Sequence, residues 1–445
     1  MILADYIKKH AQATPNKIAV FCGGQSVTYK ELSDRIDEKS DYLKQNFKDT
    51  RFPIHVFRAS QDAEFLVKYF ALHRAGLVAA PLEKDTPDDV FHEIDTKLSS
   101  CSVPDGTADV LYTTGTTGKS KGVMISHRTI LANAENLIEG QGFTEDLLFI
   151  ITGPLNHIGS LSKLYPVLML GATLAITEGM KDVSQLFAAM DLPYAKVATF
   201  LVPSAIRILL KLNAKRLAQY ADKIDFIETG AAPIMQSDMQ LLCEVLPKSR
   251  LYNTYASTET GIISTYNFND GRCRQGCLGR PMSHSEIIIT DKGLISCKGD
   301  TLMSGYAGDE ALTKSVLRDG TIFTSDFGKI DDEGMLVLFG RENDVINTGG
   351  FKVAPTEVEN VAMSLPQVKD CVCAPAVHPV LGTVIKLFFV SDDTPADIRA
   401  IAKQLKSRLE NYKVPFYYEQ TDEIKRTYNG KTDRKFYKNS ENKVG

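Results

Sequence analysis

The segment 113–122, TTGTTGKSKG, places glycines, threonines and two lysines directly after an apolar run. Glycines let a backbone approach a ligand closely, and successive backbone N–H groups can surround a phosphate together with hydroxyl donors. Lys119 or Lys121 can add a point charge for the outer phosphates. The segment therefore predicts a phosphate-binding loop, in preference to a surface turn that is merely rich in glycine and threonine.

One candidate for this loop is the P-loop of kinases and NTPases. That motif reads G-x-x-x-x-G-K-[ST], and residues 118–120 supply its end. Its opening glycine is replaced by Thr113, and the sequence has no Walker-B pattern. These departures disfavour a P-loop enzyme. The other motifs of the chain are needed to identify the kind of phosphate-binding loop.

The composition is that of an ordinary globular protein of two or three domains. The chain has 445 residues, of which 43% are hydrophobic and 24% charged, and a net charge of −4. This charge gives no reason to expect nucleic acid as a partner. The sequence has neither a signal-peptide pattern nor an apolar run of ~18 residues, so we expect a cytoplasmic protein without membrane insertion. The close cysteine pairs, Cys273/Cys277 and Cys371/Cys373, lack C-x-x-C spacing and predict reduced thiols.

The elements that must position this loop alternate between strands and helices. Strand-like runs at 17–22, 147–152, 196–203 and 225–230 are separated by helical patterns, which predicts a largely parallel α/β sheet. Short β-rich pieces between 285 and 340 predict a small barrel or antiparallel sheet. The sequence therefore predicts an α/β fold with a large N-terminal domain, residues 1–340, that includes this barrel-like part.

After residue 340 the pattern predicts a separate small α+β domain, residues 341–445. A helix is expected at 355–365 and strands at 371–377 and 384–390. Residues 396–409 have helical spacing, with Ile398, Ile401, Leu405 and Leu409 on one face.

The loop and its flanks, LYTTGTTGKSKGVMISH at 111–127, resemble the phosphate loop of the acyl-adenylate-forming (AMP-binding) superfamily. Ser120 stands where this family usually has a proline, which would fix φ. Further segments resemble the other motifs of the family in the same order: VTYKEL (27–32), AGLVAAP (75–81), NTYASTET (253–260), GY (305–306) with TSD (324–326), GRENDVINTGGFKVAPTE (340–357) and NGKTDR (429–434). The resemblance covers nearly the whole chain and is greatest to acyl- and aryl-CoA synthetases.

The resemblance implies that the protein activates a carboxylic acid with ATP and Mg²⁺, releases pyrophosphate, and passes the acyl group from acyl-AMP to CoA. It implies that Glu259 associates with Mg²⁺, Thr258 binds the α-phosphate and Asp326 accepts from the ribose hydroxyls, although the family's T-G-D reads T-S-D here. Tyr255 would stack on adenine. The nucleotide-binding residues implied are Thr113, Thr114, Gly115, Thr116, Thr117, Gly118, Lys119, Lys121, Gly230, Ala231, Ala232, Pro233, Tyr255, Asp326 and Arg341.

The C-terminal domain is implied to be a mobile lid. Lys431 corresponds to the lysine that bridges the substrate carboxylate and the α-phosphate in the transition state. Asn343 stands where the family usually has a hinge Asp or Lys, and asparagine tolerates unusual φ/ψ. Gly349 and Gly350 resemble the surface that carries the pantetheine arm of CoA.

The acid itself is expected to be neutral and either aliphatic or aryl. The resemblance places His157 at the pocket and near the thiol tunnel, and the expected acyl-pocket residues are His157, Val202, Ala256 and Ile262. No acidic residue lies between 153 and 170 to pair with an ammonium group, which disfavours amino acids.

Two alternatives to a CoA ligase stay open. An acyl carrier protein could replace CoA as the acceptor. A catalytically silent nucleotide-binding relative is the other alternative, and the retention of Glu259, Asp326, Arg341 and Lys431 argues against it.

Overall fold

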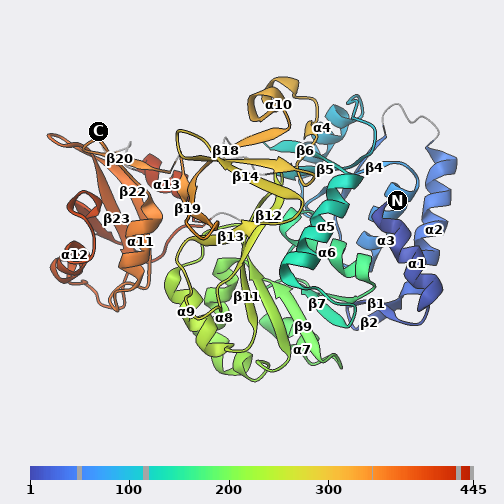
Figure 1. The fold of residues 1–445 in the computed structure, drawn as a ribbon, viewed down its shortest axis with the longest axis horizontal. Coiled ribbons are helices and arrows are strands. Elements are labelled where there is room, and N and C mark those ends of the chain that lie inside the picture. Colours follow the sequence, from blue (N-terminus) through green and yellow to red (C-terminus); the bar gives the residue numbers. More distant parts are fainter. Residues whose placement is uncertain (48–52, 114–119, 343, 427–431, 441–445) are drawn as a thin grey trace.

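The computed structural model describes residues 1–47, 53–113, 120–342, 344–426 and 432–440. Strands β1 to β19 lie in a large N-terminal part, and a smaller part from β20 onward lies to one side of it (Figure 1). This is the predicted α/β architecture with a large first part and a small last part.

A long mixed sheet forms the centre of the N-terminal part. Its parallel strands lie side by side in the order β1 (Ile18–Cys22), β8 (Thr173–Ile176), β7 (Leu147–Ile151), β9 (Lys196–Phe200), β10 (Ile224–Thr229) and β11 (Arg250–Ser257), and β2 (Gln25–Thr28) pairs antiparallel with β1. The predicted parallel α/β sheet is thus present.

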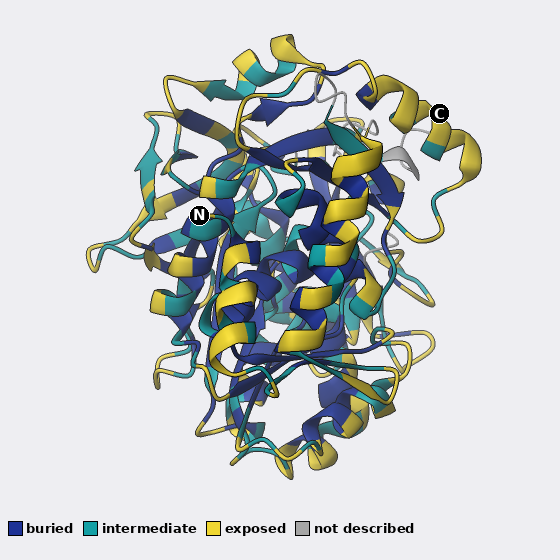
Figure 2. Cartoon of the chain, turned by 90° about the vertical axis from the view of Figure 1, so that its right-hand side faces the viewer, coloured by how far each residue is buried: buried dark blue, intermediate teal, exposed yellow. Residues whose placement is uncertain are grey.

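Successive residues of a strand point to opposite faces of the sheet. Helices cover both faces here, because the strands carry apolar residues on both. Phe149 of β7 belongs to one apolar cluster and Ile150 to the other. The first cluster contains residues of α1 (Leu3–Ala13), α5 (His127–Gln141) and α6 (Ile158–Leu170). The second contains residues of α7 (Val183–Met190), α8 (Pro203–Ala218) and α9 (Gln236–Val245). Figure 2 shows the central strands as mainly buried, with exposed residues on the outer helices and on the loops.

A second sheet carries the glycine–threonine loop. It contains the parallel strands β3 (Ile54–Arg58), β4 (Val78–Leu82) and β5 (Thr107–Thr113), followed by the antiparallel β6 (Lys121–Ser126) and β16 (Gly305–Tyr306). Its neighbours along the chain are α2 (Tyr29–Asn46), α3 (Ala63–Arg74) and α4 (Asp88–Leu98). In the VTYKEL segment, Thr28 and Glu31 form a capping box that fixes the start of α2.

The β-rich segment after residue 260 is antiparallel and continues the long sheet. Strand β13 pairs with both β12 and β19, which joins the two groups of strands. The group contains β12 (Gly261–Asn267), β13 (Cys277–Pro281), β14 (Ser285–Ile289), β15 (Leu294–Gly299), β17 (Leu317–Arg318), β18 (Thr321–Ile330) and β19 (Leu336–Arg341), together with α10 (Glu310–Val316). This group is the barrel-like part that the sequence predicts.

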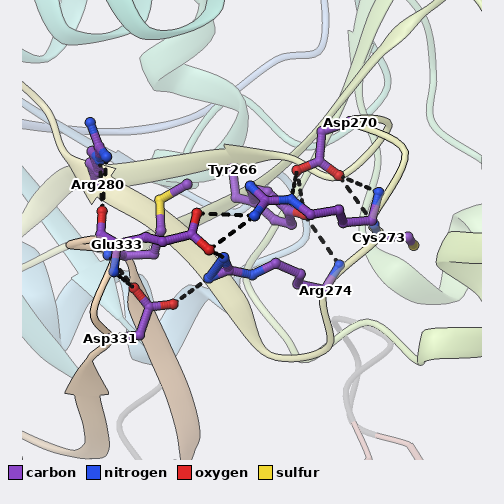
Figure 3. Close-up of polar contacts among 9 residues, drawn as sticks. Tyr266, Asp270, Cys273, Arg274, Arg280, Asp331 and Glu333 are labelled. Atoms are coloured by element: carbon purple, nitrogen blue, oxygen red, sulfur yellow. Dashed lines mark hydrogen bonds and ion pairs between the residues drawn. The ribbon is translucent and has the colours of Figure 1, made fainter.

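Ion pairs hold the loop between β12 and β13 against the turn between β18 and β19 (Figure 3). Arg272 and Arg274 both donate to Glu333 at 2.9 Å, Arg274 also pairs with Asp331, and Arg280 donates to the Glu333 backbone oxygen. The cluster thereby fixes one end of β19. A cavity of about 490 Å³ beside it includes Arg280 in its lining, and none of the residues predicted for the functional site lines that cavity.

The C-terminal part has its own apolar core. It is built from β20 (Ile346–Thr348), β21 (Phe351–Val353), α11 (Pro355–Met363), β22 (Asp370–His378), β23 (Gly382–Val390), α12 (Ile398–Lys406), β24 (Tyr417–Gln420) and α13 (Arg434–Ser440). The helix predicted over 396–409 is shorter in the structure, where α12 spans Ile398–Lys406. Ile401 and Leu405 of α12 are buried, Leu409 packs against the core from beyond the helix end, and Ile398 at the helix start is 39% exposed.

Two further sequence expectations can be compared with the structure. All eight cysteines are free thiols, as predicted. Among the described residues, no helix combines the length and apolar character needed to cross a membrane.

A buried ion pair between Arg434 and Glu359 closes the C-terminal core. Arg434 donates two hydrogen bonds of 2.7 Å to the two carboxylate oxygens of Glu359, which also accepts from the Cys373 backbone N–H at 2.8 Å. Glu359 is 4% exposed. A buried carboxylate that loses its partner is costly, since its charge is then neither solvated nor paired.

We therefore expect Arg434→Met to destabilise the C-terminal part by about 3–5 kcal/mol, the cost of breaking a buried pair. Urea unfolding combined with hydrogen exchange of β22 and β23 measures this loss. Arg408→Met is the control, because Arg408 is exposed in the same part of the chain and its side chain hydrogen-bonds only to the Ser364 hydroxyl among the described residues. Equal stability of the two variants would contradict the prediction.

Candidate active site

The candidate residues gather at the carboxyl ends of the parallel strands. Strands β7, β9, β10 and β11 run in the same direction, so their carboxyl ends meet at one edge of the sheet. Ligands of open α/β sheets bind at this edge. His157 follows β7, the Gly230–Pro233 segment follows β10, and Tyr255 and Ala256 lie at the end of β11.

The ribose candidate Asp326 is held by residues of two other strands. Tyr255 Oη donates to Asp326 Oδ2 at 2.8 Å, and Arg341 Nε donates to Oδ1 at 3.2 Å. Asp326 and Arg341 are direct partners in the β18–β19 pairing. The carboxylate can still accept further hydrogen bonds, because each of its oxygens has two lone-pair directions. This arrangement can hold a diol such as that of a ribose.

The Tyr255 hydroxyl is a permanent donor in this arrangement. Burial raises the pKa of Tyr255 well above its usual value, and the nearby charge of Asp326 raises it further. Sequence reasoning assigned the ring of Tyr255 to adenine stacking and did not foresee the bond from its hydroxyl. The stacking role stays a prediction, whereas the contact with Asp326 is a feature of the fold.

The backbone before Asp326 accommodates the serine that replaces the family's glycine. The Asp326 N–H donates to Thr324 Oγ1 at 3.1 Å, and the Ser325 carbonyl accepts from the Glu342 N–H at 2.7 Å. Neither contact needs a left-handed backbone at residue 325, so the T-S-D departure is compatible with this strand.

The magnesium candidate Glu259 lies in a tight turn between β11 and β12. Ser257 and Thr260 fix the turn reciprocally, since each backbone N–H donates to the hydroxyl of the other residue at 3.1 and 3.0 Å. Gly261 follows at φ +67, where a Cβ would lie 2.5 Å from the Thr301 carbonyl oxygen, so only glycine fits. The turn therefore presents Thr258 and Glu259 in a defined orientation.

Tyr306 connects this turn to the glycine–threonine loop. Its hydroxyl donates to Glu259 Oε1 at 3.0 Å, and Lys121 Nζ lies 5.4 Å from the centre of its ring. Burial and the charge of Glu259 raise the pKa of Tyr306, so its hydroxyl stays protonated. The sequence analysis includes Gly305–Tyr306 among the family motifs but gives the tyrosine no role. That motif was the only sequence feature pointing to Tyr306 as a site residue.

The loop itself joins two antiparallel strands. Thr113 at the end of β5 pairs with Lys121 at the start of β6, and Ser120 Oγ donates to the Thr113 carbonyl at 3.1 Å. A P-loop leads from a strand into a helix, whereas this loop leads into another strand. The structure therefore excludes the P-loop interpretation. The predicted contacts of Thr114, Gly115, Thr116, Thr117, Gly118 and Lys119 lie outside the described residues.

The adenine candidate segment Gly230–Pro233 has an unusual backbone. Ala231 adopts φ 66, in the left-handed region that residues with a Cβ rarely occupy. Such outliers concentrate at functional sites. Gly230 lies close to the next strand, since a Cβ there would lie 3.0 Å from the Thr254 carbonyl oxygen.

The expected acyl-pocket residues do not all belong to one cluster. Ala256 and Ile262 are partners across β11 and β12 and pack with the cluster of α5 and α6. Val202 packs against the cluster on the opposite face of the sheet. His157 Nε2 lies 3.1 Å from Glu83 Oε1, a partner that sequence reasoning missed although it follows the AGLVAAP motif by two residues.

In the C-terminal part, Lys431 and Asn343 lie outside the described residues, but their neighbours are anchored. Asp344 accepts from Lys438 Nζ at 2.9 Å. Gly349 and Gly350 form the turn of the β20–β21 hairpin, with φ 55 and 85. A Cβ would meet no atom within 4 Å at either glycine, so lack of space does not explain them. The positive φ values that the turn requires do. A contact with CoA there stays a prediction.

Comparisons with known proteins identify the family. Residues 92–307 match the family model of the AMP-binding enzyme, and residues 357–431 match that of the AMP-binding enzyme C-terminal domain. The chain is 28% identical to 2-succinylbenzoate–CoA ligase of Bacillus licheniformis over 97% of this chain and 98% of that protein.

Two solved structures share the fold. ATP-bound MatB from Rhodopseudomonas palustris superimposes with a TM-score of 0.87 at 23% identity, over 100% of both chains. O-succinylbenzoate coenzyme A synthetase (MenE) from Bacillus subtilis, in complex with ATP and magnesium ion, superimposes with a TM-score of 0.82 at 23% identity, over 97% of this chain and 98% of that one.

The chain belongs to the AMP-binding enzymes, the acyl-adenylate-forming superfamily. It is an enzyme of the AMP-forming acid–thiol ligase (acyl-CoA synthetase) type.

We expect Asp326→Asn to weaken ATP and AMP binding by ~10–100-fold, because a hydrogen bond to a charged acceptor contributes about 1.5–3 kcal/mol. Isothermal titration calorimetry measures the change. Asp291→Asn, an exposed carboxylate in the β14–β15 turn, is the control and should bind like the wild type. Unchanged nucleotide affinity in the Asp326 variant would remove Asp326 from the site.

Proposed function

We propose that the chain joins a neutral carboxylic acid to CoA in two steps at the edge described above. In the first step a carboxylate oxygen attacks the α-phosphorus of ATP, and the bond to the bridging oxygen breaks to give acyl-AMP and pyrophosphate. In the second, the deprotonated thiol of CoA attacks the acyl carbon, and AMP leaves with the electron pair. The observation that carries the proposal is that Tyr255, held to Asp326, and Glu259, held to Tyr306, lie four residues apart around one strand end.

The first step brings two anions together, so positive charge must offset their repulsion. Lys121 contacts the Tyr306 ring next to Glu259, and Lys431 is proposed to reach the substrate carboxylate and α-phosphate from the C-terminal part. Glu259 fits a magnesium site, because Mg²⁺ is typically held by one or two carboxylates together with phosphate oxygens and water. When bound, Mg²⁺ would neutralise phosphate charge.

The two parts of the chain, residues 1–340 and 341–445, are proposed to change their relative arrangement between these steps. Among the described residues, polar contacts join the two parts, and no buried apolar cluster spans both of them. Arg207 Nη1 donates to Asp370 Oδ1 at 3.3 Å, and the Gln236 N–H donates to Asn360 Oδ1 at 3.3 Å. Small polar interfaces of this kind permit domain movement. Asn343 is proposed as the hinge.

A panel of neutral aryl and aliphatic acids should support acid-dependent ATP–pyrophosphate exchange. Lys431→Ala should lower this exchange by at least ~100-fold, since one transition-state donor is worth about that much. The same variant should still convert supplied acyl-AMP to acyl-CoA. Lys435→Ala is the control, because Lys435 is exposed on the same segment. ADP as the product would contradict the proposal.

The acceptor is tested with the best acid of this panel. Acyl-CoA formation with free CoA is the expected result, since curated relatives covering nearly the whole chain are CoA ligases. Transfer only to a phosphopantetheinylated acyl carrier protein would replace CoA with the alternative acceptor and leave the first step unchanged.

A further inference from the structure

A buried ion pair that the proposed mechanism does not use lies beside the candidate acyl site. Lys163 of α6 donates to Glu228 Oε1 of β10 at 2.8 Å, and both side chains are 1% exposed. Burying two charges costs several kcal/mol per ion, and the mutual attraction only partly offsets this cost. Apolar residues of similar size would stabilise the contact between helix and sheet at least as well. Stability alone therefore gives little reason for the pair.

The position of the pair is that of a ligand-binding residue. Glu228 lies two residues before Gly230, and it pairs across the sheet with Phe200 at the carboxyl end of β9. Lys163 Nζ lies 5.3 Å from the centre of the Phe200 ring. Gly159, two residues after His157, approaches the same ring so closely that a Cβ would lie 3.2 Å from it. Phe200 thus connects the pair to the segments that begin at His157 and Gly230.

The pair is also incomplete. Glu228 Oε2 is buried and has no hydrogen-bond partner among the described residues. The same holds for the hydroxyl of Ser162, which directly precedes Lys163. Buried carboxylate oxygens are nearly always hydrogen-bonded, because an unpaired one loses its solvation without compensation. By contrast, both oxygens of the buried Glu359 accept hydrogen bonds from Arg434. An unsatisfied acceptor at this place is what a donor on the substrate would complete.

We propose that Lys163 and Glu228 are specificity-determining residues that select an acid carrying a hydroxyl group on its acyl part. This inference rests on the proposed function and specifies its substrate class. A hydroxyl can donate to Glu228 Oε2 and accept from a second N–H of Lys163, so it satisfies both partners without adding charge.

Other substituents fit this pair less well. A hydrocarbon leaves Glu228 Oε2 unpaired, a second carboxylate is repelled by Glu228, and an ammonium group is repelled by Lys163. Glu228 is therefore not expected to bind the ammonium group of an amino-acid substrate, since Lys163 already compensates its charge. A site built to bind a hydroxyl rejects the analogue that lacks it, because the polar groups of the site are then left unpaired.

The test compares acids that differ only by a hydroxyl: 4-hydroxybenzoate with benzoate, and 6-hydroxyhexanoate with hexanoate. ATP–pyrophosphate exchange gives kcat and KM for each acid. The corresponding N-acylsulfamoyl adenosines give binding constants that do not require turnover. In the wild type we expect the hydroxylated member of at least one pair to be preferred by at least ~10-fold in kcat/KM and in affinity. Equal values for both members of both pairs would overturn the inference.

The decisive variant is Lys163→Met/Glu228→Leu, because it removes both charges and leaves no unpaired ion in the core. It should fold, and it should lower the preference for the hydroxylated member to less than ~3-fold by improving binding of the plain acid. A preference that stays unchanged in a folded double variant would make the pair purely structural and overturn the inference. Circular dichroism and the melting temperature establish folding.

The matched control is Lys196→Met/Asp146→Leu. Lys196 and Asp146 lie 3.1 Å apart at the amino end of the parallel strands, where Lys196 begins β9 and Asp146 directly precedes β7. Removing this pair should leave the preference unchanged. The binding readout separates the two proposals. Absence of exchange with every acid contradicts the proposed function, whereas the difference between the paired adenosine analogues, and its loss in the double variant, still decides the role of Lys163 and Glu228.

Discussion

The hydrogen bond from Tyr255 to Asp326 joins the parallel and antiparallel halves of the long sheet, and the candidate nucleotide site depends on it. Tyr255 lies on the last parallel strand and Asp326 on an antiparallel strand, 71 residues later in the chain. Arg341 holds the other carboxylate oxygen from the end of β19. Because the ion pairs around Glu333 fix the opposite end of β19, the register that sets Arg341 opposite Asp326 is supported from both ends.

The chain treats its buried charges in two different ways. Around Glu359 every carboxylate oxygen has a donor, and the result is a closed core. Around Glu228 one carboxylate oxygen has no donor among the described residues, at the edge where the other candidate residues gather. A completed pair is consistent with a structural role, while an incomplete one directs attention to a ligand, because an unsatisfied buried acceptor has a cost that something must offset.

Much of the architecture was predictable because it follows local periodicity. The alternation of apolar strands and amphipathic helices predicted the parallel sheet, and a change of texture near residue 270 predicted the antiparallel group. The capping box of Thr28 and Glu31 is readable from VTYKEL. The ends of helices were predicted less accurately. Ile398, expected on the buried face of its helix, is partly exposed because it is the first residue of α12.

The sequence by itself determined the family, since the order of motifs along the chain can be read without knowing how far apart they lie in space. It also supplied the residue types of the site, with glycines where the backbone turns left-handed and carboxylates where a nucleotide is bound. Only the tertiary structure decided that the glycine–threonine loop connects two paired strands and is not a P-loop, because the residue types of the motif do not show that a strand paired with β5 follows it. Likewise, the partners of Asp326, Glu259, His157 and Lys163 come from other elements, and contacts between distant segments leave no spacing in the sequence from which they could be read.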